Sequence, residues 1–296
     1  MKYITITGGL GNQMFIHAFC LSLRNKGKKA VLFVPRKTES KGYGHQGYEL
    51  EKLFQTKRFD GRFSVLCNSF VQLYSQFIRL FPRKWKPRLF NLIGIHIVSV
   101  SENFIYYQEV FDFKHKHEMF MGTWQSELFF KDAKDIVRRE FAFNEELLSE
   151  MTIETRKHVI ELNSVSIHIR RGDYLSNQYS NGFAGVCTNI YYENAIKFIK
   201  EKVEYPQFYV FTDDKEWVRE HFEMNGAIYI NFNNGKDSWQ DMYLMSQCKH
   251  NIIANSSFSW WGAWLNNNPD KIVVAPKLWW RLFEKDDVVP GDWIRI

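Results

Sequence analysis

Apolar residues recur along the chain in two rhythms, which together predict alternating strands and helices. Residues 2–7 alternate apolar with polar side chains and 29–34 are mostly apolar, as short buried strands are. Between them, a glycine-rich turn leads into a helical pattern over 14–24. A strand, a helix and a strand in this order form a βαβ unit, so the chain is predicted to open with a Rossmann-like half.

The middle of the chain carries a weaker pattern. It predicts a polar loop over 36–48, a helix near 68–81, strands near 97–100 and 104–107, and helices over 126–141 and 144–162. We expect a boundary between two α/β halves near 150–163, at the end of this region.

The second half has the clearer pattern, because short apolar runs alternate there with helical segments. The predicted strands cover 165–169, 207–211, 227–231, 251–254 and 271–275. Strands separated by helices of 10–15 residues indicate a parallel sheet. The predicted fold class is therefore α/β, with two Rossmann-like domains over 1–155 and 156–296.

Composition narrows the classes of protein that fit. Of the 296 residues, 45% are hydrophobic and 17% aromatic, which excludes a disordered chain. The net charge of +6 favours anionic partners, but many soluble proteins share such an excess. The four cysteines lie far apart, which disfavours a zinc site or a disulfide framework and fits a reducing cytosol.

No segment has the pattern of a signal peptide or of a membrane-spanning helix, so we expect a soluble, cytoplasmic protein. One basic segment, 79–88, interleaves arginine and lysine with aromatic residues. Three interpretations of it stay open: peripheral contact with the inner face of the cytoplasmic membrane, contact with nucleic acid, and a solvated loop.

The first group of candidate site residues follows the predicted strand 165–169. Arg170 and Arg171 emerge at its carboxyl end, where open α/β sheets bind ligands, and Asp173 follows. Arginine grips phosphate through a planar fork of donors, so the pair points to a diphosphate. If His168 and Arg170 face one side of the strand, Arg171 faces the other and can pair with Asp173 as support. The alternative is a surface ion pair.

Two further strand ends carry polar residues. Asp213 and Asp214 follow the strand 207–211 and can accept hydrogen bonds from a ribose or a nucleobase, or can cap a helix. After the strand 251–254, polar and aromatic residues open a helix and can bind an anion or simply cap that helix, namely Asn255, Ser256, Ser257, Phe258 and Ser259.

The glycine-rich turn after the first strand is the fourth motif. Gly9, Gly11, Asn12 and Gln13 bring backbone close to a ligand or merely form a tight turn. The third glycine of a dinucleotide fingerprint is missing, which disfavours an NAD site. The chain also has no Asp-x-Asp sequence and no Walker lysine loop. Arginine and helix dipoles must then neutralise a bound diphosphate.

The four motifs, Gly8–Phe15, His168–Asp173, Phe211–Asp214 and Asn255–Leu265, occur in this order and together resemble the bacterial α-1,2-fucosyltransferases of glycosyltransferase family 11. The resemblance spans 3–275. It implies two facing Rossmann-like domains in the GT-B arrangement, GDP-fucose bound by the C-terminal domain, and a β-galactoside acceptor bound mainly by the N-terminal one. It also implies transfer with inversion, without a metal ion or another cofactor.

The resemblance assigns roles to individual residues. Arg170 would grip the β-phosphate, His168 would contact the nucleoside or phosphate, and Asp213 or Asp214 would hold guanine or ribose. Ser256, Ser257 and Phe258 would bind phosphate, and the glycine-rich turn would face donor sugar or acceptor. Asp173 and His17 are the candidates for a base. The alternatives are a fucosyltransferase relative with another linkage or donor, and, against our expectation of no nucleic-acid partner, a protein that binds RNA through 79–88.

Overall fold

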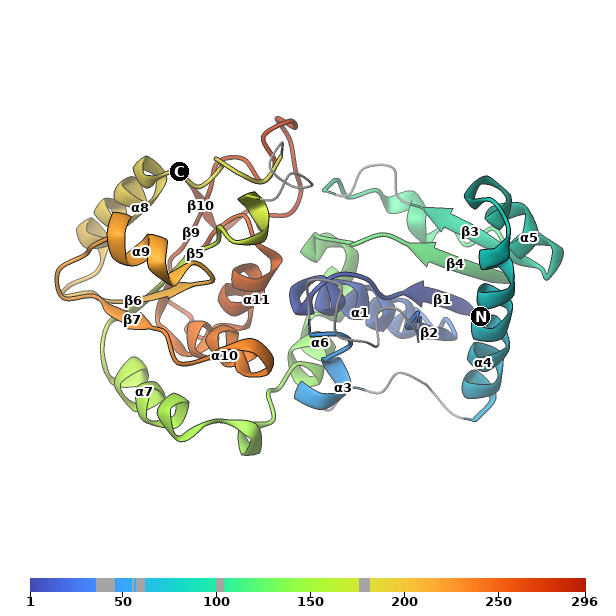
Figure 1. Ribbon diagram of the computed structural model, residues 1–296, viewed down its shortest axis with the longest axis horizontal. Coiled ribbons are helices and arrows are strands. Elements are labelled where there is room, and N and C mark those ends of the chain that lie inside the picture. The colour runs from blue at the N-terminus through green and yellow to red at the C-terminus, as the bar shows by residue number, and fades with distance from the viewer. Residues whose placement is uncertain (36–45, 55, 57–61, 100–103, 176–181) are drawn as a thin grey trace. The chain divides into compact units, whose positions relative to one another are not determined.

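The computed structural model describes residues 1–296 except 36–45, 55, 57–61, 100–103 and 176–181. The chain divides into two compact units, Met1–Asn144 and Glu145–Ile296. Each unit has its own parallel β-sheet with helices packed against it (Figure 1). The predicted pair of Rossmann-like α/β halves is therefore present.

The first unit is built on a four-stranded parallel sheet with the order β2-β1-β4-β3. The strands are β1 (Lys2–Thr5), β2 (Ala30–Phe33), β3 (Ile95–Ser99) and β4 (His117–Met121). The helix α1 (Leu10–Asn25) connects β1 to β2 and is buried along most of its length. Its Phe19 ring stacks on Trp124 at 4.2 Å, which anchors α1 to the segment that follows β4.

The remaining helices of this unit are short except for α4. They are α3 (Leu50–Leu53), α4 (Arg62–Phe77), α5 (Lys86–Leu92) and α6 (Lys134–Glu140), with 3-10 turns η1 (Ile78–Leu80), η2 (Arg83–Trp85), η3 (Gln108–Phe111) and η4 (Glu127–Ala133). Val71 of α4 and Phe90 of α5 pack into one core with Tyr3 and Val31 of the sheet. This burial fixes α4 and α5 on the sheet.

The second unit has a six-stranded parallel sheet with the order β10-β9-β8-β5-β6-β7. Its strands are β5 (Ser164–Ile169), β6 (Gln207–Thr212), β7 (Ile228–Ile230), β8 (His250–Ile252), β9 (Val273–Ala275) and β10 (Ile294–Arg295). Its helices are α7 (Glu150–Glu161), α8 (Asn189–Lys202), α9 (Lys215–His221), α10 (Trp239–Gln247) and α11 (Ser257–Leu265), with 3-10 turns η5 (Glu145–Leu147), η6 (Asp173–Leu175) and η7 (Gly235–Asp237). Every residue of β5 is buried, because strands flank both of its edges and side chains of α8 such as Tyr192 and Ile199 pack in one core with Val165, Ile167 and Ile169.

Two sequence-based assignments in the first unit are wrong. Residues 104–107 form no strand, and the strand that lies between β1 and β3 is β4, which the pattern did not reveal. The strand β4 was not predicted because it takes part in a buried ion pair: Lys2 of β1 lies opposite Glu118 of β4, with Nζ 2.6 Å from Oε2. A charged residue at an interior position hides a strand from any search for apolar runs.

Two other elements differ in extent from their predictions. The helix expected over 126–141 is the 3-10 segment η4 followed by α6, with a kink at Phe130. The helix expected over 144–162 begins only at Glu150, where the side chain of Ser149 caps it by accepting a hydrogen bond from the Thr152 N–H. The strand β10 was not predicted.

The units divide at Asn144, ahead of the predicted boundary at 155, because α7 packs with the second unit. The Ser149 N–H donates to Gln240 Oε1 of α10 at 2.8 Å. The Thr152 hydroxyl donates to Asn233 Oδ1 at 3.3 Å, and Asn233 in turn donates to Asp241 Oδ1 at 2.9 Å. This buried polar chain ties α7 to α10.

Asp241 makes the stability of this unit depend on pH. Burial raises the pKa of its carboxyl to about 7, despite the opposing effects of the Asn233 hydrogen bond and the charge of Lys215. A pKa raised by folding stabilises the fold below the unfolded pKa, and this contribution is lost as pH rises through 7. We expect Asp241→Asn to stabilise the fold at pH 8 by at most about 4 kcal/mol, and so to raise Tm there. At pH 4 the substitution should leave Tm nearly unchanged.

Thermal unfolding of both proteins from pH 4 to 8 measures this dependence. The exposed Asp292, replaced by asparagine, is the matched control, and its Tm should follow the parent at every pH. Equal slopes of Tm against pH for the parent and Asp241→Asn would contradict the assignment.

Candidate functional site

The order in which the chain adds strands to the second sheet reverses next to β5. After β5 the chain adds β6 and β7 on one side, and it then returns to place β8 and β9 on the other (Figure 1). Open α/β sheets bind ligands outside the carboxyl ends of the strands at such a switch point. Here β5 leads into Arg170–Asp173 and β8 leads into Asn255–Ser259, so the two predicted motifs meet at one edge of the sheet.

Arg170 is held in place by Asp213 across the ends of β5 and β6. Its Nη1 lies 3.1 Å from Asp213 Oδ2, and both side chains are about one quarter exposed. The same carboxylate accepts the backbone N–H groups of Arg171 at 2.9 Å and Gly172 at 3.1 Å. Asp213 therefore fixes both the loop after β5 and the guanidinium above it.

Arg171 points to a different set of partners. Its Nε lies 3.3 Å from Asp214 Oδ2, and its guanidinium stacks 3.7 Å above the Trp217 ring. Asp214 also caps α9, because its side chain accepts the N–H of Trp217 at 3.2 Å. These contacts hold Arg171 against the protein, and its supporting role at the site stays a prediction.

Among the described side chains, the ion-pair partner of Arg171 is Asp214, because the parallel register sets Ile169 opposite Thr212 and so brings the next residues of both strands together. The pairing with Asp173 expected from the sequence stays a prediction. Asp173 begins the short 3-10 turn η6, and its side chain lies outside the described part of the chain. Its candidacy as a base stays a prediction.

His168 is a neutral group at the end of β5. Burial, and then the charge of Arg170, lower the pKa of its imidazole to about 3. The ring lies 5.8 Å from that of Phe258, which opens α11, and Nδ1 has no hydrogen-bond partner among the described residues. A neutral imidazole offers one donor and one acceptor. His168 can therefore recognise a ligand by hydrogen bonding and not by charge.

The serines that open α11 have unequal roles. Ser256 is buried and caps the helix by accepting the N–H of Phe258 at 3.3 Å, so the capping interpretation holds for it. Ser259 is also buried and donates to the Ser256 carbonyl at 3.4 Å. Ser257 and Phe258 are partly exposed. An anion at this helix end would thus meet Ser257, backbone N–H groups and the positive end of the helix dipole.

Asn255 braces the site from inside. Its amide nitrogen donates to the carbonyls of Phe183 at 3.1 Å and Trp279 at 3.2 Å. Its backbone carbonyl accepts the hydroxyl of Tyr174 at 2.8 Å. Because both amide hydrogens have internal partners, its predicted contact with substrate would be indirect.

Two aromatic residues of this site were not predicted from the sequence. Tyr174 lies 5.8 Å below the Arg170 guanidinium, and Trp217 supports Arg171. The sequence does contain a signal for them, because arginine stacks favourably on aromatic faces. Tyr174 lies four residues after Arg170, and Trp217 lies three residues after Asp214, the partner of Arg171.

The glycine-rich turn occupies the equivalent switch point of the first sheet, between β1 and β4. Gly9 is the N-cap of α1, and Gly8 has a positive φ of 75° that favours glycine. Asn12 accepts a hydrogen bond from Gln125 at 2.5 Å, which joins the ends of the two strands. These contacts give the turn a structural role, and its ligand contacts stay predictions.

Gln13 fastens this turn to a neighbouring loop. Its buried amide donates to the carbonyls of Gly8 at 3.0 Å and Gly47 at 2.7 Å, and it accepts the N–H of Glu49 at 3.0 Å. Gly11 is buried within the first turn of α1. Glu49, which the sequence analysis did not single out, carries a carboxyl whose pKa burial raises to about 7.

The segment after β4 is strained and incompletely hydrogen-bonded. Trp124 has a positive φ of 52°, which is unfavourable for a bulky residue. Its Nε1 and the hydroxyls of Thr5 and Thr123 are buried without a hydrogen-bond partner in the part that the structure describes. Such strain and such unsatisfied groups concentrate at functional sites. This strain could not be predicted from the sequence, because β4 itself was not predicted.

His17 does not have the surroundings of a base. It is fully buried in α1, with its ring 5.7 Å from Phe141 and its Nε2 3.7 Å from Glu140 Oε2. Burial lowers the pKa of the imidazole and outweighs the opposing effect of Glu140. A ring without solvent access cannot receive the proton of a bound hydroxyl, so its burial argues against the predicted role.

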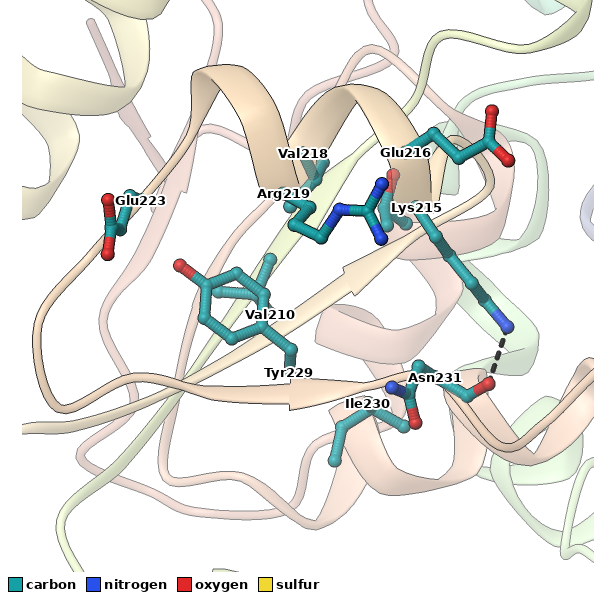
Figure 2. A pocket seen from close by; sticks show the side chains of 10 residues that line it. Val210, Lys215, Glu216, Val218, Arg219, Glu223, Tyr229, Ile230 and Asn231 are labelled. Carbon is teal, nitrogen blue, oxygen red and sulfur yellow. Dashed lines mark hydrogen bonds between the residues drawn. The ribbon is translucent and has the colours of Figure 1, made fainter.

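A cavity of about 500 Å³ lies between α9 and the strands β6 and β7 (Figure 2). Val210, Val218 and Ile230 form apolar walls, and Lys215 closes one end by donating to the Asn231 carbonyl at 2.5 Å. The cavity favours no particular ligand charge, because its charged lining residues have both signs. They are Lys215, Glu216, Arg219 and Glu223.

A model of the family named Glycosyl transferase family 11 matches residues 1–296. The chain belongs to glycosyltransferase family 11. The resemblance inferred from the four motifs is confirmed, and this family 11 member is a glycosyltransferase.

Three relatives of this family 11 chain differ in their names and in how much of the chain they match. The O-antigen biosynthesis glycosyltransferase WbnK of Escherichia coli is 32% identical, with 99% of this chain and 100% of that protein covered. An alpha-1,2-colitosyltransferase of Escherichia coli is 33% identical, with 98% and 97% covered. The galactoside alpha-(1,2)-fucosyltransferase 1 of Lagothrix lagotricha is 28% identical, with 50% of this chain and 42% of that protein covered.

Solved structures support the fold. The NodZ alpha-1,6-fucosyltransferase soaked with GDP-fucose matches with a TM-score of 0.53 at 12% identity, covering 89% of this chain and 91% of that one. The fucosyltransferase NodZ from Bradyrhizobium gives the same TM-score at 10% identity, with 88% and 91% covered. The predicted GT-B fold class is thereby confirmed. Within the described residues, no helix is both long and apolar enough to span a bilayer, and no three or more His, Cys, Asp or Glu side chains form a metal-binding group.

Proposed function

We propose that this family 11 enzyme transfers L-fucose from GDP-fucose to the O2 hydroxyl of a terminal galactose, with inversion and without a metal ion. One observation carries the proposal: Arg170, fixed by Asp213, stands at the carboxyl end of β5, and the neighbouring strand β8 leads into the N-terminus of α11. A guanidinium fork and a helix dipole at one switch point suit a diphosphate leaving group.

The chemistry follows from charge. When the bond between fucose and the β-phosphate breaks, the sugar becomes oxocarbenium-like and negative charge grows on the phosphate. Arg170 and the first turn of α11 stabilise that charge, and both are positioned before the reaction begins. Because the chain contains no Asp-x-Asp sequence, we assign the neutralising role to these groups.

The neighbouring residues have supporting roles in this proposal. Asp213 and Asp214 hold the two arginines, and their own contacts with guanine or ribose would use their remaining acceptor positions. His168, neutral and next to Phe258, suits a hydrogen bond to the nucleoside or the phosphate. Ser257 suits the phosphate. Asp173 remains the candidate to accept the proton of the galactose hydroxyl, a step that needs only a weak base when the sugar centre is already cationic.

Colitose is the second candidate for the transferred sugar. The alpha-1,2-colitosyltransferase is similar over 98% of this chain, whereas the galactoside alpha-(1,2)-fucosyltransferase 1 matches only half of it. The two sugars differ by one hydroxyl, at C3. A site that hydrogen-bonds this hydroxyl would reject GDP-colitose by about 10⁴-fold or more in kcat/KM.

The deciding experiment compares GDP-fucose with GDP-colitose in the presence of EDTA, with lactose and N-acetyllactosamine as acceptors. We expect GDP release from GDP-fucose, a product heavier by one deoxyhexose, and an α-1,2 linkage by NMR. A higher kcat/KM for GDP-colitose would favour the second candidate. Loss of transfer in EDTA, restored by Mg²⁺ or Mn²⁺, would contradict metal independence.

A further inference from the structure

One face of α4 exposes a continuous stripe of large apolar side chains. The exposed fractions are 69% for Leu66, 56% for Phe70, 65% for Leu73 and 54% for Phe77. With 3.6 residues per turn, these four positions fall within about 60° of one another around the helix. Single exposed apolar residues are ordinary, but an aligned series of them marks an interaction surface.

This stripe is separate from the face of α4 that packs on the sheet. Val71 and Ile78 are buried in the core of the first unit, and the Tyr74 hydroxyl donates to the Leu89 carbonyl at 2.7 Å, which ties α5 to α4. Further exposed apolar residues follow α4 in the chain, namely Leu80, Trp85 and Leu92. We call the exposed residues of α4, η1, η2 and α5 together the α4–α5 face (Figure 1).

The α4–α5 face is strongly basic. The segment 62–101, with Arg62 included, contains six arginines and lysines and no aspartate or glutamate. Of these, Arg79, Lys84 and Arg88 are exposed and Lys86 is partly exposed. None of these four makes an ion pair with any residue that the structure describes. The segment that follows the apolar stripe in the chain therefore carries positive charge that no acidic residue of the segment compensates.

We propose that the α4–α5 face docks on an anionic lipid bilayer, with the stripe of α4 inserted at the interface and the cations of 79–88 over the lipid headgroups. A helix with an apolar face and neighbouring lysines and arginines binds membranes in this way, and a tryptophan such as Trp85 suits the boundary between tails and water. This inference rests on the first unit alone and does not depend on which sugar is transferred.

Two other occupants fit less well. A second copy of the chain, paired symmetrically, would set the same cations against each other with no acidic residue of the segment to compensate them. Nucleic acid would match the cations, but it has no apolar surface to cover the aliphatic Leu66 and Leu73. A bilayer supplies both the negative charge and the apolar interior.

Sedimentation of the full-length protein with lipid vesicles tests the proposal. Vesicles of phosphatidylcholine alone are compared with vesicles that also contain phosphatidylglycerol, at low and high salt. We expect binding to the anionic vesicles, weakened by salt. Replacing Phe70 and Leu73 together by serine should weaken binding to the vesicles by about a hundredfold, since each apolar side chain that moves from water into the bilayer contributes favourable free energy of binding. Replacing Lys84 and Lys86 by glutamate should weaken it by at least about tenfold.

Matched controls separate docking from general effects. Met151 and Ile160 are exposed apolar residues of α7, and Lys197 and Lys202 are exposed lysines of α8. Serine at the first pair or glutamate at the second should leave vesicle binding unchanged. Transfer to soluble lactose without lipid reports folding and should be the same in all variants. Failure to bind anionic vesicles, or a dimer in light scattering that the Phe70/Leu73 variant dissociates, would overturn the proposal.

Discussion

Arg170→Lys is expected to lower kcat for sugar transfer nearly as far as Arg170→Ala, by about 10²–10³-fold. The guanidinium combines a contact with Asp213 and donors for a phosphate in one planar fork. A lysine keeps the positive charge but has a single ammonium group. That group cannot contact both Asp213 and the phosphate in the way that the planar guanidinium fork does. The loss should lie mainly in kcat, because negative charge on the phosphate grows in the transition state.

Initial rates of GDP release over a range of donor concentrations separate kcat from KM. The matched control is Arg156→Ala, which removes a partly exposed arginine of the same unit that pairs with Glu145 at 3.4 Å. That variant should keep the parent rate. Full activity in Arg170→Lys would show that charge alone suffices and would contradict the bidentate grip.

The sequence predicted the second sheet well because its interior strands have no charged interior positions. The apolar runs of β5 and β6, and the Arg170 that follows β5, could be placed at a sheet edge from alternation and the rule for strand ends alone. Where a strand carried its charge inward, as Glu118 does in β4 opposite Lys2, the same reasoning failed.

Pairings between residues distant in the sequence were beyond prediction. Arg171 was expected to pair with the nearby Asp173, and its pairing with Asp214, which lies 43 residues away, was not expected. Strand register decides this, and register is set by packing of whole strands. Burial likewise depends on the packing of whole elements. The sequence suggested His168 as a contact residue but could not show that burial leaves its imidazole neutral.

The cross-strand contact of Asp213 supports the second large prediction. Asp213→Asn is expected to lower kcat/KM by about 10²-fold, because a misplaced positioning group can cost that much. The aspartate accepts hydrogen bonds from Arg171 N–H and Gly172 N–H and pairs with Arg170. An asparagine has one acceptor oxygen in place of two and no charge, so it cannot satisfy all three donors.

Gly172→Ala should reproduce this loss without touching the carboxylate itself. A Cβ at Gly172 would lie 2.8 Å from Asp213 Oδ2, so the carboxylate must move away from its donors. Gly291→Ala is the matched control, since a Cβ there meets no atom within 4 Å. Equal rates for the two alanine variants would contradict the argument.

A double-mutant cycle then distinguishes positioning of Arg170 from a general structural role. If Asp213 acts through Arg170, adding Asp213→Asn to Arg170→Ala should lower kcat/KM little further, since interacting residues are not additive. Additive losses would mean that Asp213 supports the loop alone, through its hydrogen bonds to the backbone of Arg171 and Gly172. Unchanged thermal unfolding of Asp213→Asn would assign the loss to the position of Arg170 and not to unfolding. The catalytic arginine and its carboxylate would then be one unit, built from the ends of two neighbouring strands.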